Sequence, residues 1–287
     1  MSDRQLDVVV PDVSYAEGLR WHDGELWYSD MLRDQVCTVS PSGKVHVRFS
    51  VDEPSGLGFL PDGRVAVVAR GPGSLLAGRP DGSLYTVCPL VAQGVIGVND
   101  LVTDTAGRMY IGSLGAHYRP GDETRDWTAG APGRLLWVQP DGDWGVAVDD
   151  LACPNGMVIS PDGATLLVAE TFRHRITAFD RAPDGSLTRP RVHARTEGGS
   201  PDGMTLDVEG AVWVGTGADF RRIDASGRTI DRFEVHGLRC IACCLGGDDL
   251  RTLYLAVVDM TLEGFAAGHA HGSILAARVD VPGAGSP

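Results

Sequence analysis

Five residues with oxygen-bearing side chains occupy the same place in a repeated phrase, and they are the first candidates for chemistry. Each lies eight residues before a glycine that ends a turn, or seven in one case: Glu17, Ser55, Asn99, Asn155 and Asp202. We call these five residues the heads. An Asn or Asp before a Gly is by itself commonly a turn former. Their chemistry therefore depends on whether the fold brings the heads together.

The residues that follow each head have the pattern of a β-hairpin. Turns such as Pro61-Asp-Gly63 and Pro161-Asp-Gly163 join antiparallel strands, because Pro fixes the first φ and Gly accepts a positive φ. The runs after these turns are rich in Val, Leu, Trp and Tyr, which is typical of strands. A second hairpin follows each copy. Each repeat, of about 40 to 55 residues, therefore contains four predicted strands.

A sixth, weaker copy of the phrase begins at Ala242. Six such units predict an all-β fold, a six-bladed β-propeller with four-stranded antiparallel blades. The last unit lacks a fourth strand, whereas residues 5–11 look like a strand without a partner. We expect this N-terminal strand to complete the last blade and close the ring, and Pro11 to end it. Residues 1–287 would then form a single domain.

The amino-acid composition argues against some classes of binding partner. A formal net charge of −13 argues against nucleic acid and anionic membranes, which both attract basic surfaces. No apolar run approaches the roughly 18 residues of a membrane helix, and no secretory leader is recognisable, so we expect a cytoplasmic protein. The run that holds Cys240, Cys243 and Cys244 is apolar, which favours a buried strand over a redox or zinc site. The oligomeric state stays open.

The predicted fold gathers the heads. The first strand of each blade of a propeller lines the central channel, so the heads converge at one mouth. Two carboxylates placed there would repel each other and acquire raised pKa values unless a cation lay between them. An all-oxygen set without clustered His or Cys favours a hard ion. We therefore expect one divalent cation, Ca²⁺ first, with Mg²⁺, Zn²⁺ and Mn²⁺ as alternatives.

Several stretches, in order along essentially the whole chain, resemble the regucalcin/gluconolactonase family of lactone hydrolases. They include Glu17-Gly-Leu-Arg-Trp21, Asn99-Asp-Leu-Val-Thr103, Cys153-Pro-Asn-Gly-Met157 and Ser200-Pro-Asp-Gly-Met204. The resemblance implies a six-bladed propeller that hydrolyses sugar lactones and related esters. It implies one divalent cation held by Glu17, Asn155 and Asp202. It also implies that Asn99 and Asp100 lie near the substrate.

These assignments lead to a hypothesis of metal-dependent lactone hydrolysis. The cation would polarise the lactone carbonyl, and an activated water would attack it. Asp202 is the candidate general base, and Asn99 would orient substrate or water. Two alternatives stay open, because propellers host many functions. One is a ligand-binding propeller with a structural cation and no catalysis; the other is a different reaction at the same metal site, such as phosphotriester hydrolysis or an isomerisation.

The sequence departs from the family at one informative position. Sugar-lactone hydrolases of this family often carry an Arg two residues before the second Asn, whereas Gly97 stands here. A less polar lactone thus becomes more plausible as substrate. Two long loops, 113–132 and 259–271, are expected on the face of the heads, where they would form a lid. Within the first loop, His117 and Tyr118 are candidate substrate-binding residues. Arg70, just beyond a predicted strand of the second repeat, is a further candidate for substrate binding.

Overall fold

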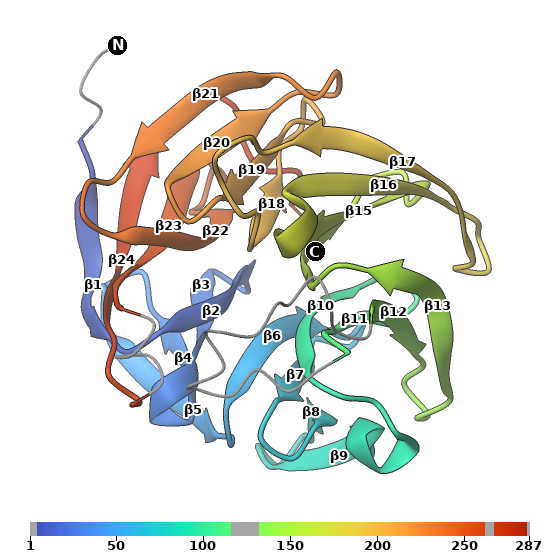
Figure 1. Ribbon diagram of the computed structural model, residues 1–287. Helices are drawn as coiled ribbons and strands as arrows, with labels where there is room; N and C mark the ends of the chain where they lie inside the picture. The colour runs from blue at the N-terminus through green and yellow to red at the C-terminus, as the bar shows by residue number, and fades with distance from the viewer. Residues whose placement is uncertain (1–4, 116–131, 262–266, 286–287) are drawn as a thin grey trace.

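Six four-stranded antiparallel sheets stand in a ring, as Figure 1 shows. The computed structural model describes residues 5–115, 132–261 and 267–285. The ring confirms the six-bladed β-propeller predicted from the repeats. Each blade uses four strands that follow one another in the chain, except the last, which takes its outer strand from the N-terminus.

The blades follow the order of the repeats. Blade one contains β2 (Ala16–His22), β3 (Glu25–Asp30), β4 (Gln35–Val39) and β5 (Val45–Ser50). Blade two contains β6 (Pro54–Phe59), β7 (Val65–Ala69), β8 (Ser74–Gly78) and β9 (Leu84–Cys88). Blade three contains β10 (Val98–Thr103), β11 (Met109–Ser113), β12 (Gly133–Val138) and β13 (Trp144–Leu151).

The second half of the ring repeats this plan. Blade four contains β14 (Pro154–Ile159), β15 (Thr165–Glu170), β16 (Arg175–Arg181) and β17 (Leu187–Arg195). Blade five contains β18 (Met204–Leu206), β19 (Val212–Gly215), β20 (Asp219–Ile223) and β21 (Thr229–Glu234). Blade six contains β22 (Arg239–Gly246), β23 (Thr252–Asp259), β24 (His271–Arg278) and β1 (Asp7–Val13). Short 3₁₀ turns occur at η1 (Met31–Arg33), η2 (Leu90–Gln93) and η4 (Thr171–Arg173).

Local sequence explains the hairpins. Gly63 and Gly163 adopt φ values of 83° and 70°, the left-handed conformation that the Pro-Asp-Gly turns require. Inner strands such as β10 and β14 are buried along their whole length, whereas the outer strands β5 and β17 are largely exposed. The apolar core therefore lies between neighbouring blades, where Val, Leu and Ile side chains of adjacent sheets pack together.

The N-terminal strand closes the last blade as predicted, with β1 antiparallel to β24. The prediction that Pro11 ends this strand was wrong, because β1 continues to Val13. The pairing shifts register between Val10 and Val13, which places Pro11 at an irregularity of an outer strand. Proline is tolerated at such positions because the ladder does not need its missing N–H donor.

Glycines that follow the heads let the inner strands approach closely. A Cβ added at Gly18 would lie 2.5 Å from the carbonyl oxygen of Ser55, and one at Gly156 would lie 2.3 Å from that of Asp202. The backbones after Glu17 and Asn155 are thus held against the next blade. A Cβ at Gly203 would likewise meet Ala242 and the carbonyl oxygen of Ile241, which identifies apolar Ile241 as the sixth head. The inner strands contact one another around the ring, including β2 with β22.

Two further predictions concern the cysteines of blade six and membrane-spanning helices. Cys240, Cys243 and Cys244 are buried within β22, so this cysteine cluster is part of a strand, as predicted. Within the described part of the chain, none of the helices has the length and apolar character needed to cross a bilayer.

Candidate functional site

The amide and hydroxyl heads form a chain of hydrogen bonds at one mouth of the channel. Ser55 donates from Oγ to Oδ1 of Asn99 at 3.4 Å, and Asn99 donates from Nδ2 to Oδ1 of Asn155 at 3.0 Å. Asn155 in turn donates to Oγ1 of Thr171 at 3.3 Å. These heads are buried, so the bonds fix the direction of each side chain. The structure therefore brings Asn99 and Asn155, far apart in sequence, into direct contact.

The two carboxylate heads lie on the other side of this mouth, with Ile241 between them in the order of blades. Burial raises the pKa of Glu17 well above its usual range, and the charges of Asp202 and Asp100 raise it further. Burial and the charge of Asp100 raise the pKa of Asp202 to about 7, although Arg239 opposes this effect. Both carboxyl groups thus sit where a negative charge is costly without a cation.

The donor set fits a divalent cation. Oδ1 of Asp202 is inaccessible to solvent, yet it has no hydrogen-bond partner among the described residues. No Arg, Lys or His nitrogen of the described chain lies within 4.0 Å of the carboxylate oxygens of Glu17 or Asp202. No group of three His, Cys, Asp or Glu gathers as a metal site in these residues, so Asn155 would have to supply a third ligand. A carboxylate oxygen without a hydrogen-bond partner and an amide oxygen suit Ca²⁺ or Mg²⁺.

Asp100 lies deeper in the channel than the head beside it. Its Oδ1 accepts the backbone N–H of Leu101 at 2.7 Å and faces Nη2 of Arg20 at 3.4 Å. Burial raises the pKa of Asp100, while Arg20 opposes the shift. Asp100 is only 3% exposed. In this arrangement its charge acts on Glu17 and Asp202 through the interior of the channel.

Thr171 links the two sides of the site, and sequence reasoning missed it. Its hydroxyl donates to the carbonyl oxygen of Pro201 at 2.9 Å while accepting from Asn155. Pro201 immediately precedes Asp202. Thr171 therefore connects the predicted ligand of blade four with the segment that carries the predicted ligand of blade five.

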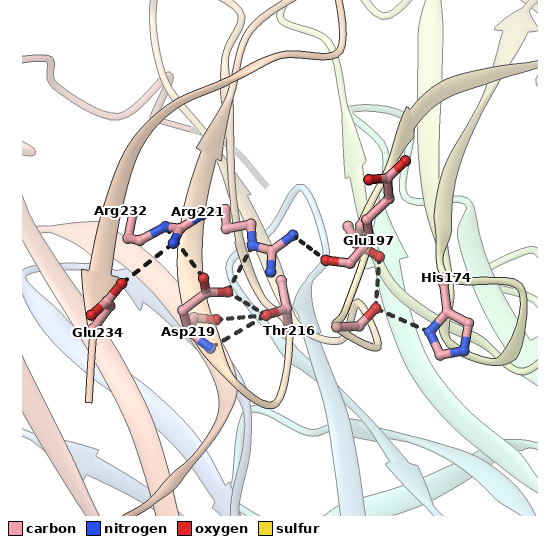
Figure 2. A network of polar contacts seen from close by, with 9 residues as sticks. His174, Glu197, Thr216, Asp219, Arg221, Arg232 and Glu234 are labelled. Atoms are coloured by element: carbon pink, nitrogen blue, oxygen red, sulfur yellow. Dashed lines mark hydrogen bonds and ion pairs between the residues drawn. The ribbon is translucent and has the colours of Figure 1, made fainter. Parts of the chain in front are cut away.

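A larger polar network supports the segment before Asp202 (Figure 2). Thr216 donates from Oγ1 to Asp219, whose carboxylate also meets Arg221 at 2.8 Å and Arg232 at 3.4 Å. The carbonyl oxygen of Thr216 accepts the backbone N–H of Ser200 at 2.8 Å. The β19–β20 connection is thus stiffened by buried charge-assisted bonds, and it holds the approach to Asp202 in place.

Residues two positions before the heads form a rim around the mouth. Tyr15, Cys153 and Arg239 occupy this position in blades one, four and six, as Gly97 does in blade three. Glu17 and Asp202 raise the pKa of the Tyr15 hydroxyl beyond the effect of burial, and burial raises the pKa of the Cys153 thiol to about 12. Sequence reasoning did not assign these rim residues, although alignment of the repeats two residues upstream would have found them.

Gly97 has a φ of 68°, a conformation that an Arg side chain would strain. Its neighbour Ile96 is 41% exposed. Glycine therefore suits this position, and the exposed side chain beside it is apolar. Arg70 follows β7 and lies close enough to lower the pKa of Glu17. His117 and Tyr118 lie outside the described residues, as do residues 116–131 of the first long loop and 262–266 of the second.

Residues 15–259 match the family model described as the SMP-30/gluconolactonase/LRE-like region. The chain belongs to this family. Members that resemble it include a 6-deoxy-6-sulfogluconolactonase of Pseudomonas putida, 31% identical over 66% of this chain and 64% of that protein. A pentonolactonase of Haloferax volcanii is 28% identical over 98% of this chain and 95% of its own. Regucalcin of Xenopus laevis is 27% identical over 89% and 87% of the two chains.

Solved structures with this SMP-30/gluconolactonase-like fold superpose over nearly the whole chain. A calcium-binding regucalcin of Agrobacterium tumefaciens has a TM-score of 0.82 at 21% identity, covering 99% of this chain and 97% of that one. A gluconolactonase of Xanthomonas campestris has a TM-score of 0.75 at 22% identity, covering 99% and 90%. At such identities the likeness establishes the fold alone.

Proposed function

We propose that this protein is a lactone hydrolase whose reaction takes place at the channel mouth. A divalent cation, Ca²⁺ first, would be held there by Glu17, Asn155 and Asp202. The observation that carries the proposal is a pair of carboxyl groups, Glu17 buried and Asp202 partly buried, that have raised pKa values and no cationic partner within 4.0 Å in the described chain. Membership of the family supports it, as do relatives named gluconolactonase, sulfogluconolactonase and pentonolactonase.

We assign a separate role in opening the lactone ring to the cation and to Asp202. Bound cations of this kind polarise a carbonyl oxygen and make a bound water more acidic. Asp202 is partly exposed at the mouth and its pKa is raised to about 7, so we assign its carboxylate the role of general base toward the attacking water. The water oxygen bonds to the carbonyl carbon, the ring C–O bond breaks, and the ring oxygen leaves as a hydroxyl once it is protonated. The product is a hydroxy acid.

Asn99 and Asp100 prepare the site for this reaction. Oδ1 of Asn99 already accepts a bond from Ser55 while its Nδ2 binds Asn155, so its amide plane is fixed beside the predicted ligand. We propose that this fixed amide orients substrate or water. Asp100 keeps negative charge beneath the site and so favours a bound cation. His117 and Tyr118 stay candidates for substrate contact from the long loop.

The rim favours a particular kind of lactone. Gly97 replaces the family's frequent Arg, and exposed Ile96 stands beside it. Fewer hydrogen-bond donors face a polyhydroxylated ring on this side. We therefore propose a lactone less polar than an aldonolactone as the preferred substrate.

A chelation assay on a lactone panel tests the function. EDTA should abolish hydrolysis, and added Ca²⁺ or Mn²⁺ should restore it, with apolar lactones turned over faster than aldonolactones. Asp202→Asn should lose activity by about a hundredfold or more, the scale of a general base, whereas Ser55→Ala, a head outside the predicted ligand set, should stay within several-fold of wild type. Full activity in EDTA or in Asp202→Asn would refute the metal-dependent reaction. A metal-loaded protein that hydrolyses no lactone would favour the ligand-binding alternative.

A further inference from the structure

A cavity opens at the far end of the inner strands, opposite the heads. It has a volume of about 410 Å³ and is bounded by the turn-side ends of β2, β6, β10, β18 and β22. The C-terminal segment closes one side, where Gly283 donates its N–H to Leu250 and Ala284 donates to Leu206. This cavity shares no residue with the heads.

Polar groups with unused hydrogen-bonding capacity line the cavity. Thr103 is 3% exposed, and its Oγ1 has no hydrogen-bond partner among the described residues. A Cβ at Gly58, which also lines the cavity, would lie 2.3 Å from this hydroxyl oxygen, so the hydroxyl lies directly over the glycine. A buried hydroxyl without a partner costs free energy, which a bound ligand would recover.

Arg20 supplies guanidinium hydrogen-bond donors to the same cavity and is 8% exposed. Its Nη1 donates to the carbonyl oxygen of Leu19 at 2.8 Å, and its Nη2 donates to that of Leu101 at 2.7 Å and faces Asp100 at 3.4 Å. These contacts leave Nε–H and one Nη1–H without a partner in the described chain. Asp104 is the acidic residue of the lining. Its carboxylate already forms an ion pair with Arg181 and accepts hydrogen bonds from the backbone N–H groups of Ala106 and Arg108.

Apolar and aromatic surface makes up the remaining wall. His22 stacks on Phe59 with ring centroids 3.7 Å apart, and Met204 and Leu206 line the cavity from blade five. A ligand that fits this combination has one anionic group, at least one hydroxyl and a short carbon chain. The volume of about 410 Å³ lies in the range of small-molecule sites, so a molecule of that kind fits.

We propose that this far-end cavity is a binding site for a small hydroxycarboxylate. The carboxylate binds the free donors of Arg20, a hydroxyl pairs with Oγ1 of Thr103, and the carbon chain packs on Phe59 and Met204. A hydroxy acid is also the chemical class that opening of a lactone releases. The binding proposal is nevertheless independent of the proposed function, because it requires neither a metal nor turnover.

Calorimetric titration of the full chain with sodium gluconate tests the site, in parallel with and without EDTA. Gluconate should bind in both conditions, since the far-end cavity holds no predicted metal ligand. Sorbitol, which lacks the carboxylate, and hexanoate, which lacks the hydroxyls, should bind at least about tenfold more weakly. Equal binding of sorbitol would refute the role of Arg20. Binding that EDTA abolishes would place gluconate at the mouth with the heads and overturn the proposal.

Variants locate the bound molecule. Thr103→Val keeps the shape of the side chain but removes the hydroxyl, and should weaken gluconate binding by about tenfold. Thr105→Phe, an exposed position on the cavity wall, should obstruct entry. Thr229→Val, the same chemical change on the exposed outer strand of blade five, should leave the affinity unchanged. If neither Thr103→Val nor Thr105→Phe changes the affinity, or wild type binds no gluconate, the site does not exist.

Discussion

Asn99 donates a hydrogen bond of 3.0 Å to Asn155 across the boundary between blades three and four. The bond joins residues 56 positions apart in the chain, and Thr171 holds the other end of the Asn155 amide. Because both partners are buried, the oxygen and nitrogen of Asn155 each have a fixed direction. We propose that this fixed amide oxygen is a metal ligand, together with Glu17 and Asp202.

Two replacements of Asn155 should distinguish the effect of its side-chain oxygen from the effect of its side-chain volume. Asn155→Asp keeps an oxygen donor and adds charge, so calcium affinity should be retained or increased. Asn155→Leu removes the donor at similar volume and should weaken calcium binding by about tenfold or more, the scale of one lost hydrogen bond or ligand. Calorimetric titration with Ca²⁺ measures both. Equal affinity in the two variants would remove Asn155 from the ligand set.

The stability of the metal-free protein should depend on pH in a defined direction. The folded-state pKa values of Glu17 and Asp202 lie above their unfolded values, to about 7 for Asp202. The folded state therefore binds more protons than the unfolded chain between about pH 4 and pH 7, and its stability falls as pH rises through that window. Chemical denaturation in EDTA should show a loss on the order of a few kcal/mol.

Calcium and neutral substitutions provide the controls for this pH dependence. Saturating Ca²⁺ should remove the loss, because an ion that binds the folded state adds stability and offsets the repulsion. In EDTA, the free energy of unfolding of Asp202→Asn should vary less with pH than that of wild type. Added Ca²⁺ should not stabilise this variant. A metal-free protein that becomes more stable from pH 4 to pH 7 would contradict the assignment of two carboxyl groups with raised pKa values.

Gly156 should tolerate no side chain. A Cβ there would lie 2.3 Å from the carbonyl oxygen of Asp202, so Gly156→Ala must push blade five away. Such overpacking costs about 1–3 kcal/mol, and displacement of Asp202 should also weaken calcium binding. Gly78→Ala is the matched control, because its Cβ meets nothing closer than 3.6 Å and its φ is negative. Melting temperature and calcium titration measure both effects; equal behaviour of the two variants would contradict the close approach of the blades.

Thr216 should matter for the position of Asp202 as well as for stability. Thr216→Val removes the hydroxyl that donates to buried Asp219, at a cost of about 1–3 kcal/mol. The loop that holds Ser200 and Asp202 should become less ordered. The folded protein should therefore bind calcium more weakly, beyond the loss that a larger unfolded fraction would cause. Asp249→Asn, which breaks an exposed pair with Arg278, should change both quantities little. Unchanged calcium affinity in Thr216→Val would show that the network is structural only.

The sequence was sufficient to predict the blades and the place of the heads, because both follow from local chemistry repeated at a fixed spacing. Pro-Asp-Gly turns specify hairpins, and one hairpin after another specifies a blade. Equivalent positions such as Asn99 and Asn155 must then converge by symmetry. The close contact of these two heads follows from that reasoning, whereas their roles as ligand and substrate contact stay predictions.

Features that break the repeat were beyond sequence reasoning. Thr171 acts on Pro201 from the 3₁₀ turn that follows β15, and no spacing along the chain indicates this contact. Arg20 reaches across the channel to Leu101, a contact that no spacing along the chain encodes. Pro11 was expected to end a strand, but the outer position of β1 and a shift in register accommodate it. In each case tertiary contacts override the local signal.

A crystal structure of the calcium-loaded protein decides whether Glu17, Asn155 and Asp202 share one ion. We predict electron density at the channel mouth with oxygens of all three side chains about 2.3–2.6 Å from the ion, the range for Ca²⁺. Density at another place, or a calcium-loaded crystal in which any of the three side chains stays outside this distance, would contradict the proposed metal centre.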